Sequence, residues 1–131
     1  MRVLVIDDDL GMTDLLTILL TPASSEVITA NTAPEGIRLV KKCDPDVVIL
    51  DLMLPEMEGW QVCQTIRETS DVPILILSAI DIPGLVAQAL DSGADDYLTK
   101  PISSGTLIAH LHKLVRRPKL LKKTVVGPKT T

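Results

Sequence analysis

The chain has 131 residues, which suits one domain and leaves no room for a second. Hydrophobic residues make up 46% of it with no Phe, one Trp and one Tyr, so the core must be aliphatic, as in strands covered by helices. The net charge of −4 conceals an acidic body, because residues 1–112 carry 17 acids and 6 bases, so we expect no direct binding of nucleic acid by this body. No apolar stretch reaches the ~18 residues of a membrane span and no leader precedes the first strand, so we expect a cytoplasmic protein without membrane contact.

Strand and helix patterns alternate five times along the chain, with short connections that predict right-handed crossovers and a mainly parallel sheet. The expected strands are residues 3–6, 26–30, 47–50, 74–77 and 97–99. The second strand ends without a strongly ionisable group, as an edge strand would. Thr32 is expected to cap the second helix and Ser103 or Ser104 the last one. The first helix is expected to bury Met12, Leu15, Leu16 and Leu19, and the fourth Ile82, Leu85, Val86 and Ala89.

The carboxyl-terminal segment differs in composition from the rest. Residues 113–131 carry 7 bases and no acid, and from Pro118 onward no clear period is present. We therefore assign residues 1–117 to the domain and residues 118–131 to a basic linker or tail, for which a contact with nucleic acid or anionic lipid is the alternative. Cys43 and Cys63 match no metal or CxxC spacing and are expected to be buried, reduced thiols.

Chemically distinctive side chains follow four of the expected strands. The first strand runs into Asp7 and Asp8, the third into Asp51, the fourth into Ser78 and the fifth into Lys100. Ligands of an open α/β sheet bind outside the carboxyl ends of its strands, so these groups should meet at one rim. Crowded carboxylates repel one another unless a cation lies between them, and all-oxygen ligands suit Mg²⁺. With an ammonium and a hydroxyl nearby, the set is suited to moving a phosphoryl group onto Asp51.

These motifs resemble those of response-regulator receiver domains of two-component signalling, in particular chemotaxis-regulator-like ones. The matching stretches are Asp7-Asp8, Asp51 with Leu54-Pro55 and Gly59, Ser78-Ala79, and the run from Gly93 to Pro101. The resemblance covers about residues 3–117 in family order and spacing. It implies a flavodoxin-like doubly wound fold, with helices on both faces of a five-stranded parallel sheet in the order 2-1-3-4-5.

The resemblance also implies roles for individual residues. Asp51 would receive a phosphoryl group, Lys100 would pair with its oxygens, and Ser78 would be drawn toward them. Mg²⁺ would be held by Asp8, Asp51 and the backbone carbonyl of Met53, with Asp7 assisting through water. The shift of Ser78 would let Tyr97 rotate inward and remodel the surface of the fourth helix, fifth strand and fifth helix. The Lys100-Pro101 bond is expected to be cis.

The implied partner is a sensor histidine kinase or a phosphotransfer protein, and the only expected chemistry is self-catalysed phosphoryl acceptance with slow autodephosphorylation. A carboxyl-terminal output domain, absent from this chain, and a weak homodimer stay open. Two departures from the family pattern bear on this. Residues 83–92 lack the charges that relatives with a winged-helix output use for dimer pairing, and Ile102 stands where Phe is frequent. Apolar Met53 and Ile80 beside the acceptor leave the lifetime of the modification undetermined.

Two other function classes compete with the phosphorylation switch. A Mg²⁺-dependent phosphohydrolase resembling the haloacid-dehalogenase group would use Asp51 as a transient nucleophile, but it places a second Asp two residues later, where this chain has Met53. A phosphate-independent interaction domain would keep the scaffold alone. All the chemical positions of the site are filled, which disfavours that interpretation.

Overall fold

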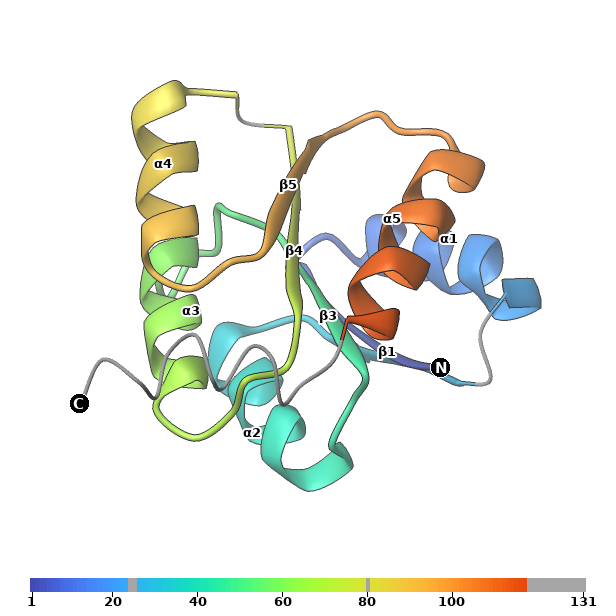
Figure 1. The fold of residues 1–131 in the computed structure, drawn as a ribbon, viewed down its shortest axis with the longest axis horizontal. Helices are drawn as coiled ribbons and strands as arrows, with labels where there is room; N and C mark the ends of the chain where they lie inside the picture. The colour runs from blue at the N-terminus through green and yellow to red at the C-terminus, as the bar shows by residue number, and fades with distance from the viewer. Residues whose placement is uncertain (24–25, 80, 118–131) are drawn as a thin grey trace.

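The computed structural model describes residues 1–23, 26–79 and 81–117 (Figure 1). Residues 118–131, assigned above to a linker or tail, lie outside the described residues, so the predicted domain boundary stays a prediction. The elements in chain order are β1 (Arg2–Ile6), α1 (Leu10–Leu20), η1 (Thr21–Ala23), β2 (Glu26–Ala30), α2 (Ala33–Cys43), β3 (Val47–Leu50), α3 (Gly59–Arg67), β4 (Ile74–Ser78), α4 (Pro83–Asp91), β5 (Asp96–Thr99) and α5 (Ser104–Arg116). No described helix has the length and apolar content that a membrane span requires.

The strands form one parallel sheet in the order β2-β1-β3-β4-β5, which confirms the predicted fold class and strand order. Every residue of β3 and β4 is buried, whereas β2 and β5 lie at the edges and are partly exposed. The central strands can therefore be uniformly aliphatic, as strands covered on both faces usually are. The prediction that 26–30 is an edge strand is also confirmed.

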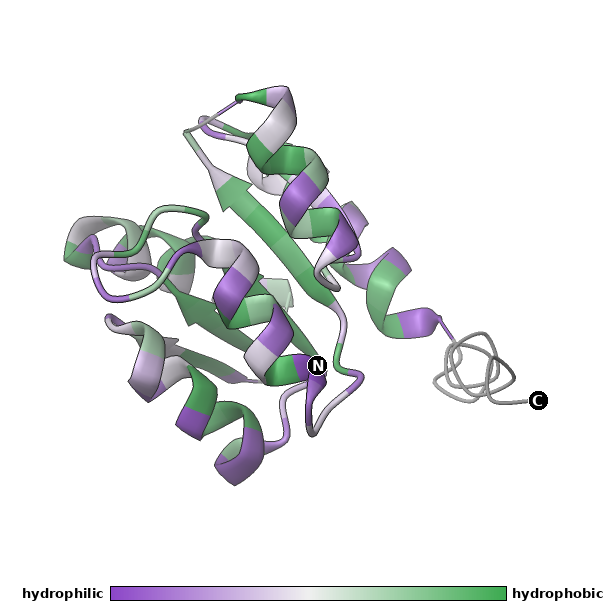
Figure 2. Cartoon of the chain, turned by 90° about the vertical axis from the view of Figure 1, so that its left-hand side faces the viewer, coloured by the Kyte–Doolittle hydropathy of each residue, from purple (hydrophilic) through white to green (hydrophobic). Residues whose placement is uncertain are grey.

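Helices cover both faces of the sheet, with α1 and α5 on one side and α3 and α4 on the other (Figure 1). The alternate side chains of β1, β3 and β4 sort into two aliphatic clusters. One cluster includes Val5, Ile49 and Leu77 and is closed by α1 and α5. The other includes Ile6, Leu50 and Ile76 and is closed by α2, α3 and α4. Figure 2 shows hydrophobic strands among helices that carry both hydrophilic and hydrophobic residues.

Short polar signals set the helix ends where the sequence predicted them. Thr32 accepts a hydrogen bond from the backbone N–H of Glu35, and Ser103 accepts one from that of Thr106. Such caps satisfy donors that the first helical turn leaves unpaired. After the carboxyl end of α4, Gly93 has φ +121°, a conformation in which a side chain would be strained.

Two helices bury less than their patterns predicted. In α1 the buried residues are Thr13, Leu16 and Leu20, while Leu15 is 47% exposed. In α4 only Ala89 is buried, and Ile82 is 53% exposed. The expectation that Leu15 and Ile82 face inward is therefore wrong. Periodicity indicated apolar faces, but each helix covers the sheet along a narrower stripe than the apolar residues span.

Arg67 links the segments that precede β4 and β5, at the amino ends of the strands, through contacts that the sequence did not predict. Arg67 donates to the carbonyls of Val72 and Gly93 at 2.7 and 2.8 Å and to the Asp95 carboxylate at 3.0 Å. Asp95 also accepts from Arg117 and from the backbone N–H of Ile74. The buried carboxylate thus has several charged and neutral donors, which is the condition for burying a charge.

The two cysteines are free, as predicted. Cys63 is fully buried in the layer between sheet and helices, and burial raises the pKa of its thiol to about 12. Cys43 is only half-buried, so the expectation of full burial is correct for Cys63 alone.

Close packing of α2 on the sheet generates a testable prediction. A Cβ added to Gly36 would lie 2.5 to 2.9 Å from three side-chain atoms of the fully buried Ile6. Gly36→Ala should therefore lower the free energy of unfolding by about 1–3 kcal/mol, the usual cost of overpacking. Urea denaturation measures the change.

Gly105→Ala in α5 is the matched control, since a Cβ there meets nothing within 4 Å. It should raise stability by up to about 1 kcal/mol because alanine is the better helix former. Equal stability of the two variants would contradict the packing argument.

Candidate functional site

The sheet itself fixes the residues that follow its strands. The backbone N–H of Asp51 donates to the carbonyl of Ile6 at 2.9 Å, and that of Lys100 donates to the carbonyl of Ser78 at 2.9 Å. Asp7 is held in the same way by the carbonyl of Ala30, at 3.1 Å. The parallel ladder thus continues one residue beyond the strands and delivers these side chains to one rim, as predicted.

Three carboxylates meet at this rim. Asp7, Asp8 and Asp51 each offer an oxygen, and the three atoms lie within 4.8 Å of one another. The Asp7 side chain is 4% exposed and that of Asp51 is 12% exposed, whereas Asp8 faces solvent. Closely spaced oxygen ligands, of which one is open to water, fit a Mg²⁺ ion that keeps part of its hydration shell.

Lys100 supplies the cation within the cluster. Its Nζ lies 2.8 Å from Asp7 Oδ2 and 3.9 Å from Asp51 Oδ2, and its side chain is 16% exposed. The ammonium is thus anchored on Asp7 and shared with Asp51. It offsets part of the repulsion between the carboxylates and leaves the cluster with an excess of negative charge.

The Asp51 carboxyl is held by donors on two sides. Its Oδ1 accepts from the backbone N–H of Met53 at 3.4 Å, and the side chain is hydrogen-bonded to the buried Ser78. Burial, followed by the charge of Asp7, raises the pKa of Asp51 above its usual value. Lys100, Ser78 and Met53 oppose this shift without cancelling it. The raised pKa means that the ionised form of Asp51 is destabilised here. Binding of a cation, or formation of a covalent bond at the carboxylate, would therefore relieve this destabilisation.

Tyr97 lies on β5, one of the strands that border the rim. The residue is half-buried against the cluster closed by α2, α3 and α4, and its hydroxyl oxygen is buried without a hydrogen-bond partner among the described residues. Burial and the charges of Asp81 and Asp51 raise its pKa. The Lys100-Pro101 peptide bond that follows this strand is cis, as the resemblance implied.

Residues 3–112 match the family model of the response regulator receiver domain. The chain belongs to this family. It is 42% identical over 119 residues to the DNA-binding dual master transcriptional regulator RpaA of Synechocystis sp., covering 88% of this chain and 49% of RpaA. It is also 42% identical over 120 residues to the cell cycle response regulator CtrA of Brucella ovis, covering 91% of this chain and 52% of CtrA.

Solved receiver domains share the fold. A two-component response regulator from Clostridium difficile is 29% identical with a TM-score of 0.83, covering 88% of this chain and 96% of that one. The receiver domain of Francisella response regulator 1452 is 31% identical with a TM-score of 0.80, covering 88% and 97%. This chain spans about half the length of the curated relatives that it matches. It is a receiver domain of two-component response regulators.

The structure also shows the contacts or exposure of other residues near the receiver site. Asp9 caps α1 by accepting hydrogen bonds from the N–H groups of Gly11 and Met12. It is not one of the three carboxylates that come together at the rim. Met53 is exposed beside Asp51, while Ile80 lies outside the described residues. His110 is half-buried, and its Nδ1 forms a hydrogen bond with the Asp96 carboxylate on β5 at 2.8 Å, which is a structural contact between α5 and β5.

Sequence reasoning missed two residues that support the receiver site. Asn31 donates from Nδ2 to the backbone carbonyl of Asp7 at 2.9 Å and to the Thr13 hydroxyl at 3.2 Å. Glu56 accepts from the backbone N–H of Ala33 at 3.1 Å and so ties the loop after β3 to the start of α2. Asn31 directly follows β2, so the rule that located the acids could have located it. Glu56 carries no such signal.

The raised pKa of Asp51 generates a prediction for the metal-free domain. A carboxyl whose pKa is higher in the folded than in the unfolded state stabilises the fold while protonated, and this contribution is lost as pH rises through the interval between the two values. Asp51→Asn should therefore be more stable than wild type at pH 7. The advantage should disappear as pH falls to the usual aspartate pKa of 3.8.

Urea denaturation in EDTA at a series of pH values measures this difference. Asp14→Asn, which removes an exposed carboxylate of α1 outside the cluster, is the control and should show no comparable pH-dependent gain. An Asp51→Asn variant that is no more stable than wild type at neutral pH would show that the cluster does not strain this carboxylate.

Proposed function

We propose that Asp51 is the phosphoacceptor of this receiver domain and takes the phosphoryl group from a histidine of a sensor kinase or phosphotransfer protein. The observation that carries the proposal is the meeting of Asp7, Asp8, Asp51 and Lys100 at one rim. Asp51 is the member of this set that is both held by neutral donors and destabilised as a free anion. It is therefore the oxygen nucleophile to which a phosphoryl group is best delivered.

In the transfer, a carboxylate oxygen of Asp51 attacks phosphorus, and the bond between phosphorus and the donor imidazole nitrogen breaks as the new P–O bond forms. The imidazole keeps the electron pair and takes up a proton. Lys100, 3.9 Å from Asp51 and linked to Asp7, compensates the charge of the phosphoryl oxygens. Ser78 can transfer its hydrogen bond from the carboxylate to one of those oxygens.

The spacing of the three carboxylates supports a Mg²⁺ requirement. Asp8, Asp51 and the backbone carbonyl of Met53 would hold the ion, with Asp7 acting through water. A bound Mg²⁺ would supply positive charge that offsets the carboxylates and the phosphoryl oxygens. The contribution of the chain is to hold the ligands on two adjacent strands before the ion arrives.

Ser78 and Tyr97 are the proposed switch residues. The buried tyrosine hydroxyl lacks a partner among the described residues, which leaves its ring free of a polar anchor on the inner side. Movement of Ser78 toward a phosphoryl oxygen would alter the space next to β5 and change the surface formed by α4, β5 and α5. Through that surface the receiver would control an output domain or a partner, in keeping with the length of its relatives.

The geometry also bears on the competing phosphohydrolase. Turnover requires a proton donor near Asp51, and the second residue after it is the exposed thioether Met53. We therefore expect one phosphoryl transfer per chain with slow loss, and no multiple turnover on small phosphate esters. A phosphate-independent interaction domain would bind its partners equally well with Asp51→Ala in the presence of donor and Mg²⁺.

The phosphoacceptor proposal predicts a mass change. Incubation of the chain with acetyl phosphate and Mg²⁺ should add one phosphoryl group, because Asp51 needs only a donor and charge compensation. Asp51→Asn should stay unmodified, and Asp14→Asn should be modified like wild type. Intact mass spectrometry measures the addition. An unchanged mass of the wild-type chain, with a kinase donor also failing, would sink the proposal.

The metal assignment predicts a stability change. A ligand that binds only the folded state stabilises it by about 1.4 kcal/mol at ten times its Kd, so Mg²⁺ should raise the midpoint of thermal unfolding. Asp8→Asn should lose most of the shift, because it removes the exposed carboxylate of the cluster. Asp14→Asn should keep it. Equal Mg²⁺ shifts in both variants would place the ion elsewhere.

A further inference from the structure

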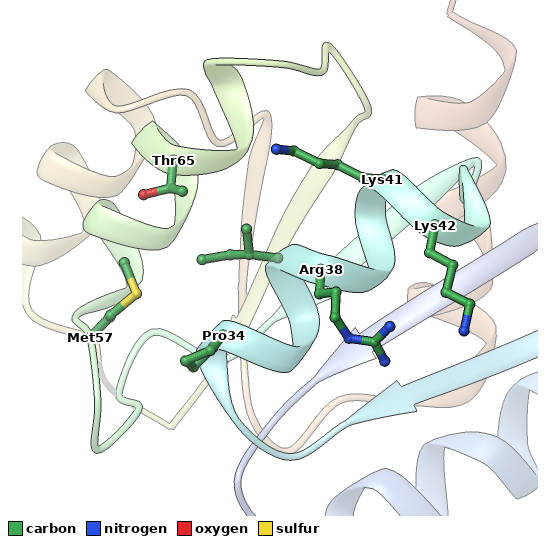
Figure 3. Close-up of a pocket in the computed structure, with 7 residues that line it drawn as sticks. Pro34, Arg38, Lys41, Lys42, Met57 and Thr65 are labelled. Atoms are coloured by element: carbon green, nitrogen blue, oxygen red, sulfur yellow. The ribbon is translucent and has the colours of Figure 1, made fainter.

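A groove of about 670 Å³ lies between α2 and α3. Its walls come from both helices and from the loop after β3, with Pro34, Ile37, Met57 and Thr65 as the uncharged lining residues. In Figure 3, Met57 and Thr65 lie on the α3 side of the groove and Pro34 stands at the beginning of α2. None of these residues belongs to the phosphoacceptor set.

Half of the basic residues of the acidic body line this groove. Arg38, Lys41 and Lys42 line it, and they are three of only six basic residues in residues 1–112, which carry 17 acids. Their spacing places them on neighbouring positions of α2. Figure 3 shows Lys41 extending from α2 toward α3, whereas Arg38 and Lys42 leave the helix on the side away from α3.

Much of this charge is not neutralised within the domain. Arg38 pairs with Glu35 at 2.7 Å, but Lys41 and Lys42 are exposed and have no ion pair within residues 1–23, 26–79 and 81–117. Glu56 accepts the backbone N–H of Ala33 through Oε1 and forms no ion pair with either lysine among the described residues. The groove therefore combines two exposed ammonium groups with apolar side chains, so the ligand that it suits is both anionic and apolar.

The charge and shape of the groove select among occupants. The chain's own residues 118–131 contain four lysines and no acid, so they would be repelled. An anionic bilayer would extend beyond the groove over a body whose residues 1–112 carry 17 acids and 6 bases, so most of the facing surface would repel it. Nucleic acid would meet an apolar lining without an aromatic ring for stacking, on a strongly acidic domain. A protein segment with apolar and acidic side chains meets both requirements.

We propose that the α2–α3 groove docks an acidic amphipathic helix of a partner protein. A third helix laid between two packed helices can place its apolar ridge against Ile37 and Met57, which is the usual mode of helix recognition in a groove. The 11 residues of α2 span roughly 16 Å, so about three turns of the partner helix would be covered. A glutamate flanking its apolar face would reach Lys41, which extends toward α3, and Lys42 would add positive charge at the outer rim of the groove.

A binding experiment on the full 131-residue chain tests this. The probes are fluorescein-labelled helical peptides of about four turns that share a leucine face and carry flanking glutamates in different registers, with lysine counterparts as charge controls. Fluorescence anisotropy should show saturable binding of at least one glutamate peptide and weaker binding of its lysine counterpart. Raising the salt concentration should weaken the glutamate complex.

Two sets of variants locate the binding. Lys41→Glu/Lys42→Glu should weaken it by about tenfold or more, since two ion pairs become repulsive. Lys122→Glu/Lys123→Glu makes the same charge change in residues 118–131 and should change binding by about twofold or less. On the α3 wall, Thr65→Glu should weaken binding and Thr65→Gln should not. All variants should still unfold cooperatively on heating and keep acetyl-phosphate labelling of Asp51.

Backbone amide chemical shifts should change along α2 and α3 on titration with the peptide. Three results would each overturn the proposal: no saturable binding by any glutamate peptide, equal weakening by the two lysine-pair reversals, or shift changes confined to the exposed leucines of α1. Binding of phosphatidylglycerol vesicles that depends on Lys41 and Lys42, without peptide binding, would instead assign the groove to a membrane surface.

Discussion

The receiver domain depends on one electrostatic arrangement at the carboxyl ends of a parallel sheet, where three carboxylates lie close together and two of them, Asp7 and Asp51, share the ammonium of Lys100. Backbone hydrogen bonds that continue the ladder beyond the strands fix the main chain of Asp7, Asp51 and Lys100, so these side chains start from adjacent positions at one rim. The excess negative charge favours a divalent cation, and a cation held there in turn favours an anionic group on Asp51.

The rest of the fold supplies the stability that such an arrangement costs. Two aliphatic clusters on opposite faces of the sheet bury the central strands completely. At the amino ends of β4 and β5, Arg67 joins the carbonyls of Val72 and Gly93 to the buried Asp95. Stabilising charge contacts and the strained carboxylate cluster thus lie at opposite ends of the strands, and the functional end can be poorly neutralised without loss of the fold.

The distribution of charge over the surface has a second consequence. An acidic body repels acidic partners in general, so a local basic site on α2 gives selectivity as well as attraction. Because Glu35 already pairs with Arg38, Lys41 and Lys42 are the groups that an incoming acid would meet. The groove also adjoins the loop after β3, in which Met57 lines the groove and Met53 lies next to Asp51. A partner docked there would be close to Asp51, the proposed phosphoacceptor.

The local patterns of the sequence determined the positions of the strands within about a residue and the identity of the rim residues, because a strand buried on both faces and an abrupt polar end can both be recognised locally. The strand order followed from the resemblance to receiver domains and not from these patterns. The sequence could not determine which helical residues are buried, so Leu15 and Ile82 were misplaced, since burial depends on how far each helix overlaps the sheet. Nor did it reveal the contacts of Arg67, Asn31 or Glu56, or the groove that gathers Arg38, Lys41 and Lys42 against Met57. These pairs are distant in the chain, and only tertiary packing brings them together.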